Sequence, residues 1–153
     1  MNRVAGSFVL ILALVLPVAA RAQTQGADEA AIRARLASYA DARNKRDAHA
    51  EALCYTLDGD FRSSAGPFVF GREAVEKQLV VNNPDYRFFL TVTHLRFITP
   101  QVAIVDADVN TGIGTNLAPL LGVYAMVKQG NDWLISSGRI SRAPMLPAAA
   151  PAR

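Results

Sequence analysis

The sequence predicts an α+β domain in which about three helices at the front of the chain cover one face of a curved antiparallel sheet at the back. Apolar residues recur at helical spacing up to residue 81, whereas the chain from Tyr86 onward is rich in β-branched and aromatic residues. Helices gathered before the strands favour this class over an alternating α/β arrangement. The 153 residues are enough for one domain with a sizeable core.

The first 22 residues have the pattern of a secretory signal peptide. Arg3 precedes an apolar run from Phe8 to Leu16, and residues 20–22 read Ala-Arg-Ala, the small-x-small form of a cleavage site. A transmembrane anchor is the alternative, but the apolar run is shorter than the roughly 20 residues that span a bilayer. The pattern therefore predicts a mature chain that begins at Gln23 and is periplasmic or secreted, with no membrane partner.

Charge and residue counts exclude several classes of partner and cofactor. The chain has 16 Lys and Arg against 13 Asp and Glu, and loss of Arg3 and Arg21 with the leader leaves 14 basic residues and a net charge of +1. Because the mature chain is nearly neutral, the high isoelectric point of the full sequence is no evidence for a nucleic-acid partner, and none is predicted. One cysteine excludes an intrachain disulfide framework, and two histidines are too few for a three-histidine zinc site. The sequence has no Gly-x-Ser-x-Gly motif for a nucleophilic serine and no Gly-rich phosphate loop, and it predicts no cofactor.

Three helices are predicted before residue 82. The first spans Asp28–Lys45 and has acids at its start, where the helix dipole favours them. The second begins after the N-cap Asp47 and ends at Asp58, and the third spans Gly71–Val81, after a short strand at Asp60–Ser64. The residues at helical spacing on the first two are Ile32, Leu36, Tyr39 and Arg43, then Ala50, Leu53, Cys54 and Leu57.

A meander of four strands is predicted after residue 85. The strands span Tyr86–Thr99, Gln101–Thr111, Leu121–Gln129 and Trp133–Ser141. Gly112–Leu120 is the longest irregular stretch, and it is either a lid over an entrance or a plain connection. Ala143–Arg153 has three prolines and no periodicity, which is typical of a disordered tail. The folded domain is therefore expected from Asp28 to Arg142, after a flexible segment at residues 23–27.

Four short motifs occur in a fixed order along this domain. They are Ala52–Phe61 (ALCYTLDGDF), Gly71–Val75 (GREAV), His94–Val109 (HLRFITPQVAIVDADV) and Gly130–Ser141 (GNDWLISSGRIS). Together they resemble the SnoaL-like branch of the nuclear transport factor 2-like superfamily, over Asp28 to about Pro144. The resemblance implies a cone-shaped sheet, a cystatin-like roll, around a hydrophobic pocket, with frequent dimerisation through the sheet. It also implies relatives that include isomerases, dehydratases, polyketide cyclases and non-catalytic binding modules.

The hairpin around Thr99 and Pro100 predicts which residues face that pocket. An even-length turn pairs Val105 with His94, Ala107 with Val92 and Val109 with Leu90, on the apolar face under the helices. The other face then carries Asp106 opposite Thr93, Asp108 opposite Thr91 and Ile104 opposite Leu95, a mixed surface suited to solvent or a partner subunit. A bulged or odd-length turn would reverse this assignment on one strand.

Two residues are candidate catalytic groups. His94 is the ionisable side chain placed mid-strand on the predicted inner face, where it is either a proton shuttle or a hydrogen-bonded structural residue. Asp60 follows the second helix near the expected pocket mouth, and relatives that use an inward carboxylate as base make it the second candidate. The predicted ligand pocket is lined by Tyr39, Val92, Val105, Tyr124 and Trp133.

Other polar residues have plainer interpretations. Asp106 and Asp108 share one face and could act in acid–base or metal chemistry, but a solvated or subunit-contact role is favoured. Arg139 would serve either an anionic ligand or a surface ion pair. Cys54 shares an apolar helix face and is interpreted as buried packing rather than a nucleophile.

Two function classes follow from these residues. The favoured one is an exported domain that binds a small apolar or amphipathic molecule in the cone. The alternative is a cofactor-independent isomerase, dehydratase or cyclase that uses His94, Asp60 or the tyrosines. An inward acid–base pair within hydrogen-bond reach of a common point would favour the enzyme. In either case a homodimer through the outer face of the sheet is expected.

Overall fold

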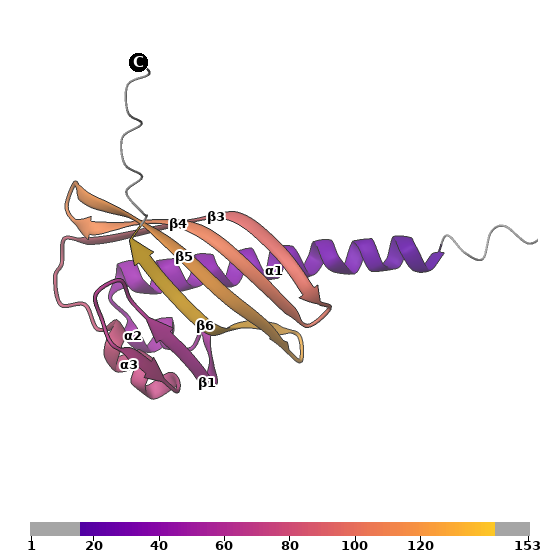
Figure 1. Ribbon diagram of the computed structural model, residues 1–153, viewed down its shortest axis with the longest axis horizontal. Coiled ribbons are helices and arrows are strands. Elements are labelled where there is room, and N and C mark those ends of the chain that lie inside the picture. The colour runs from indigo at the N-terminus through magenta and orange to yellow at the C-terminus, as the bar shows by residue number, and fades with distance from the viewer. Residues whose placement is uncertain (1–15, 143–153) are drawn as a thin grey trace, which may run out of the picture.

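The computed structural model describes residues 16–142, with side chains from residue 23 onward. One long helix, α1, runs across one face of a curved six-stranded sheet, and two short helices, α2 and α3, lie near β1 at one end (Figure 1). The predicted α+β class, with helices on one face of the sheet, is confirmed. Residues 1–15 of the predicted leader and the predicted tail, Ala143–Arg153, lie outside the described residues. Within residues 16–142 no helix is long and apolar enough to cross a membrane.

Helix α1 spans Leu16–Lys45 and therefore begins before the predicted start at Asp28. Four of residues 18–27 are alanine, which has the highest helix propensity, and Pro17 lies in the first turn, where proline is tolerated. Residues 23–27, predicted to be flexible, belong to this helix. The predicted buried stripe is confirmed, since its apolar members are fully buried, namely Ile32, Leu36 and Tyr39.

The segment after α1 differs from the prediction. Helix α2 spans only Ala48–Ala52, capped as predicted by Asp47, whose carboxylate accepts a hydrogen bond from the Ala50 backbone amide at 2.9 Å. Strand β1 then occupies Tyr55–Arg62, because aromatic and β-branched residues begin at Tyr55. The predicted continuation of the second helix to Asp58 is therefore wrong.

Short elements complete the helical end of the domain. Strand β2, Phe68–Phe70, pairs with β1, and helix α3 spans Arg72–Leu79, close to the predicted range. Gly71 stands just before α3 with a φ of 81°, a backbone conformation that favours glycine.

The last four strands form the predicted meander. They are β3 (Tyr86–Thr99), β4 (Val102–Ile113), β5 (Asn116–Gln129) and β6 (Asp132–Arg142). The strand order is β2-β1-β6-β5-β4-β3. Strand β1 runs parallel to β6 and makes the sheet mixed, whereas the other neighbours are antiparallel.

The predicted irregular stretch Gly112–Leu120 is wrong, because β4 and β5 extend through it. They are joined by a tight turn at Gly114, which has a φ of 58°. Pro119 lies in β5 opposite Asn110, where β6 has not yet begun to pair with β5. A proline is tolerated there because its missing N–H faces an unpaired edge.

A β-bulge at Thr93 overturns the predicted orientation of His94. The predicted pairs hold up to Val92 opposite Ala107, but the register then shifts by one, so His94 lies opposite Asp106 and Leu95 opposite Val105. The extra residue turns His94 to the exposed outer face. Leu95 packs against the core in its place.

Candidate functional site

Three tyrosines meet inside the cone, one from the long helix and two from strands of the sheet. Tyr39 comes from α1, Tyr55 from the start of β1 and Tyr124 from the middle of β5, and all three are fully buried. The Tyr39 ring contacts the rings of Tyr55 and Tyr124 edge-to-face, with centroids 6.0 and 5.9 Å apart. We call these three residues the tyrosine cluster.

Two glycines of the sheet make room for the cluster. A Cβ at Gly138 would lie 2.7 Å from the Tyr55 hydroxyl, and one at Gly122 would lie 2.9 Å from the Tyr124 ring. A larger residue at either position would therefore displace a ring. With Phe88 also in edge-to-face contact with Tyr39 at 5.7 Å, the centre of the cone is packed with aromatic rings. A ligand can enter the centre only if these rings move.

The phenol hydroxyls of the cluster are polar groups in an apolar interior. Within the described part of the chain, the hydroxyls of Tyr39, Tyr55 and Tyr124 have no partner in full hydrogen-bond geometry, although Tyr39 lies near enough to the Glu51, Tyr55 and Tyr124 groups to oppose the rise that burial causes in their pKa values. A buried hydroxyl without a partner costs about 1–3 kcal/mol. Three such groups in one place therefore favour a site that receives a polar atom from a bound molecule.

A buried carboxylate lies beside the cluster. Glu51, from α2, is 1% exposed, and both of its oxygens accept hydrogen bonds from Nη1 of Arg43, at 3.0 and 3.2 Å. Arg43 is itself held by the Tyr86 hydroxyl, which accepts from Nε at 2.9 Å and also accepts from the Thr111 hydroxyl at 2.6 Å. The position of the carboxylate is therefore fixed from α1 and from two strands.

Burial decides the protonation of this carboxylate. Loss of solvent raises the pKa of Glu51 to about 7, although the Arg43 guanidinium and the nearby Tyr39 hydroxyl oppose the rise. The same burial, together with the charge of Glu51, raises the pKa of Tyr39 well above its ordinary value, so its phenol stays protonated. At neutral pH the site therefore contains a carboxyl group that can gain and lose a proton, beside phenol groups that keep theirs.

The structure brings together part of the predicted pocket. Tyr39 and Tyr124 belong to the cluster, and Val105 lies directly opposite Tyr124 in the β4–β5 ladder. Val92 packs against the core from β3. Trp133 is buried too, but its indole N–H donates to Asp28, near the start of the domain, rather than to a residue of the cluster.

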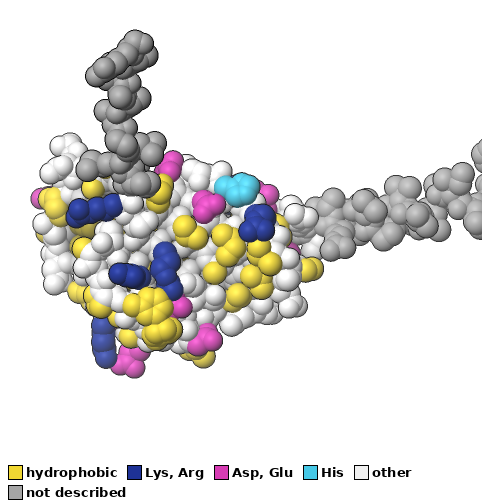
Figure 2. Space-filling view, viewed as in Figure 1, with side chains coloured by type: hydrophobic (Ala, Val, Ile, Leu, Met, Phe, Trp, Pro, Cys, Tyr) yellow, Lys and Arg dark blue, Asp and Glu magenta, His cyan; other side chains and the backbone are white. Residues whose placement is uncertain are grey.

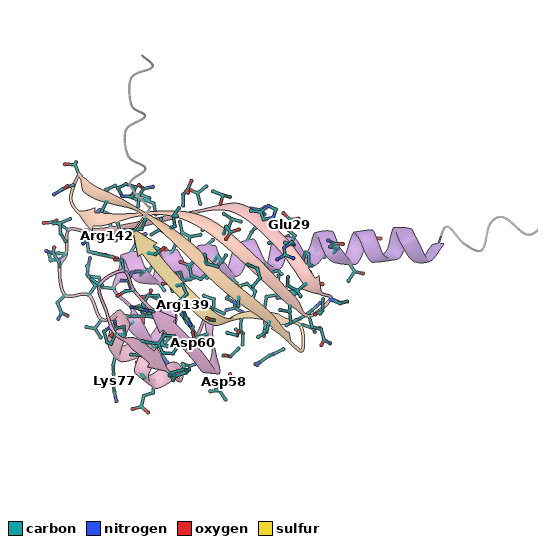
Figure 3. The ribbon with its side chains drawn as sticks, viewed as in Figure 1. Glu29, Asp58, Asp60, Lys77, Arg139 and Arg142 are labelled. Carbon is teal, nitrogen blue, oxygen red and sulfur yellow. The ribbon has the colours of Figure 1, made fainter. Side chains whose placement is uncertain are left out.

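Neither predicted catalytic residue lies in the cluster. His94 is exposed on the outer face, for the reason given above. Asp60 forms an ion pair with Arg139 of the adjacent strand and accepts a hydrogen bond from the Ser137 hydroxyl at 2.8 Å. Figure 3 shows Asp60 and Arg139 near each other on β1 and β6. Phe61 points into the core, so its neighbour Asp60 points away from it.

Sequence reasoning missed Glu51, Arg43 and Tyr55 as site residues. Arg43 carried a usable signal, since it continues the buried stripe of α1 four residues after Tyr39, and a buried arginine needs an anionic partner. Glu51 carried none, because a glutamate in a five-residue helix is ordinarily exposed. Elsewhere in the described residues, no three or more His, Cys, Asp and Glu side chains gather as a metal site.

Comparison with known proteins identifies the fold of the chain. No protein-family model and no curated protein sequence matches the chain. Several solved structures, however, match the chain in fold. One is a nuclear transport factor 2-like protein with a cystatin-like fold from Novosphingobium aromaticivorans, 15% identical, with a TM-score of 0.75 over 90% of this chain and 96% of that one. The chain has the nuclear transport factor 2-like fold.

Two further neighbours with this fold carry the names of enzymes. A candidate scytalone dehydratase from the same bacterium is 15% identical, with a TM-score of 0.70 over 78% of this chain and 86% of that one. A ketosteroid isomerase-like protein from Erwinia carotovora atroseptica is 17% identical, with a TM-score of 0.62 over 75% and 96%. The nuclear transport factor 2-like fold is confirmed by these likenesses. The SnoaL-like branch stays a prediction.

Proposed function

We propose that the cone is the acid–base site of a cofactor-independent enzyme that acts on a small carbonyl compound. The observation that carries the proposal is the tyrosine cluster beside Glu51, where three buried hydroxyls gather next to a carboxylate whose pKa is raised to about 7. Perturbed carboxylates of this kind are enriched at catalytic sites, and a catalytic group works best when its pKa is near the working pH.

The proposed reaction uses the two kinds of group differently. The Glu51 carboxylate removes a proton from the carbon next to the carbonyl, and the electrons of that C–H bond move into the carbonyl to give an enolate. The tyrosine hydroxyls donate hydrogen bonds to the enolate oxygen. In a substrate with a double bond between its β- and γ-carbons, Glu51 then returns the proton to the γ-carbon, which is an isomerisation. In a substrate with a β-hydroxyl, Glu51 gives the proton to the departing hydroxyl, which leaves as water. The names of the two enzyme-like neighbours correspond to these two outcomes.

Proton exchange in D₂O tests this proposal without knowledge of the natural substrate. Cyclic ketones and β-hydroxyketones are incubated with the protein, and loss of the α-proton signals is followed by NMR. We expect protein-dependent exchange that falls about 10²–10⁴-fold in Glu51→Gln, the usual contribution of an acid–base group. Tyr39→Phe should slow it less, and His94→Ala should leave it unchanged. Exchange that survives Glu51→Gln would exclude the proposed base.

A second candidate is binding without catalysis, the function favoured from sequence. The observation that favours it is the Arg43–Glu51 ion pair, because both carboxylate oxygens already accept hydrogen bonds from Arg43. This function predicts that a small molecule copurifies with the protein and is seen unaltered by mass spectrometry, in equal amount from wild type and Glu51→Gln. A copurified molecule that differs between these two proteins would instead indicate turnover.

We also propose that two copies of the chain associate through the outer face of the sheet. Hydrophobic side chains gather over the strands on this face (Figure 2), including Leu121 and Val123, which are 39% and 41% exposed. Val123→Asp should convert the dimer to a monomer in light scattering, whereas Leu57→Asp, on β1, should not. A wild-type monomer at micromolar concentration would contradict the proposal.

Export of the chain is a proposal as well. It is supported by the leader pattern of the first 22 residues, most of which lie outside the described range. N-terminal sequencing of the protein made with its own leader should begin at Gln23, and a chain that begins at Met1 would count against export.

A further inference from the structure

A pocket of about 300 Å³ lies away from the tyrosine cluster, between the first half of α1 and the end of β3. Small-molecule sites begin at about this size. Asp28 lines the pocket and is eleven residues before Tyr39 on α1, which places them about 16 Å apart along the helix. The lining residues are Thr24, Gln25, Asp28, Phe97, Ile98, Thr99 and Pro100.

A buried carboxylate is the strongest polar group of this pocket. Asp28 is 9% exposed, and its Oδ1 accepts hydrogen bonds from Lys128 Nζ at 2.6 Å and from the Trp133 indole at 3.0 Å. These two bonds fix the carboxylate, and a carboxylate has about four acceptor positions in all. It can therefore accept one more hydrogen bond from a molecule in the pocket. The Phe97 ring, which meets the Trp133 ring at 5.8 Å, adds an aromatic wall.

The charges around the pocket decide what kind of molecule fits. In the full-length chain, the Lys128 ammonium neutralises Asp28, and the other lining side chains are uncharged. A charged ligand would lose its hydration and find no opposite charge in return. Phe97, Ile98 and Pro100 offer apolar contact. We propose that this pocket binds a small uncharged molecule that has an apolar body and a hydroxyl group, which donates to the Asp28 carboxylate.

The chain contains one tryptophan, which makes the test direct. Because Trp133 bonds to Asp28 and contacts Phe97, occupation of the pocket should change its fluorescence. The purified protein is titrated with cyclohexanol, and with cyclohexylamine and cyclohexanecarboxylate as charged compounds of the same ring size. We expect a saturable change with cyclohexanol alone. No saturable change with cyclohexanol, or equal binding of either charged compound, would overturn the proposal.

Two matched variants locate the binding. Ile98→Glu puts a charge at the pocket wall, at a residue 49% exposed, and should weaken cyclohexanol binding at least about tenfold without loss of folding. Leu57→Glu makes the same kind of change at an exposed residue on β1, outside the pocket, and should bind as the wild type does. Unaltered binding by Ile98→Glu would show that cyclohexanol binds elsewhere and would refute the site. Both variants keep Glu51, so this result is separate from the proposed enzyme function.

Discussion

Arg43→Met should lower the free energy of unfolding by about 3–5 kcal/mol, the usual cost of removing one partner from a buried ion pair. The methionine preserves much of the apolar stem, but Glu51 is then left 1% exposed and without its cation. The Arg43 guanidinium also stacks over the Tyr86 and Phe88 rings at 5.2 and 5.3 Å, and that contact is lost as well. Urea unfolding measured at pH 8 gives the change.

Arg33→Met is the matched control. Arg33 lies on the same helix and pairs with Glu29 at 2.7 Å, but both side chains are nearly half exposed. Exposed pairs of this kind contribute at most about 1 kcal/mol, so the free energy of unfolding of Arg33→Met should stay close to that of the wild type. The loss in Arg43→Met should shrink at pH 5, where Glu51 is protonated and no longer leaves an unpaired charge. Equal losses in the two variants would show that the Arg43–Glu51 pair stabilises no more than a surface pair.

Glu51 should also give the protein a pH-dependent stability that Glu51→Gln lacks. Its folded pKa is about 7, whereas the ordinary value in an unfolded chain is 4.5, so the folded state binds more protons between these pH values. The contribution of Glu51 is therefore fully present below about pH 4.5 and is lost as the pH rises through about 7. The shift corresponds to about 3 kcal/mol.

The comparison of wild type with Glu51→Gln isolates this contribution. Other groups act in the opposite sense. Burial raises the pKa of Asp28, but hydrogen bonds from Lys128 and Trp133 outweigh it and leave that pKa lowered, so Asp28 favours folding as the pH rises. Asp28 is present in both proteins, so its contribution cancels when their unfolding free energies are compared. Unfolding free energies from pH 4 to 8 should thus show the wild type losing about 3 kcal/mol relative to Glu51→Gln, and parallel profiles would contradict the raised pKa.

Much of the fold was predictable from local sequence. The strand Tyr86–Thr99 has the predicted bounds because its β-branched and aromatic residues lie between a turn at Pro84 and another at Pro100. The stripe of α1 was predictable because three apolar residues recur at helical spacing. The end of the second helix was not, because Leu57 continues a helical pattern although it lies on β1.

The candidate site was less predictable, for two physical reasons. One extra residue at Thr93 moves every following side chain of β3 to the opposite face of the sheet from the one predicted. Nothing in the sequence near Thr93 marks this bulge. Residues of the site also come from distant parts of the chain, and only packing brings Glu51 to Tyr39 and Tyr124. Tyr39 could be named in advance because it lies on the predicted buried stripe of the first helix, and Tyr124 because it lies in the middle of a predicted strand. Glu51 could not, because its burial depends on Arg43.

Both the proposed reaction and the pH-dependent stability require the Glu51 carboxyl to exchange its proton near neutral pH inside the cone. The most direct measurement is the ¹³C chemical shift of the glutamate side-chain carboxyl carbons as a function of pH, in protein labelled at that carbon. The signal of Glu51 is the one absent from Glu51→Gln. We expect a midpoint of about 7 for this signal. A midpoint at or below the ordinary 4.5 would show that Arg43 outweighs burial and holds Glu51 ionised, so that Glu51 could not serve as the proposed base near neutral pH.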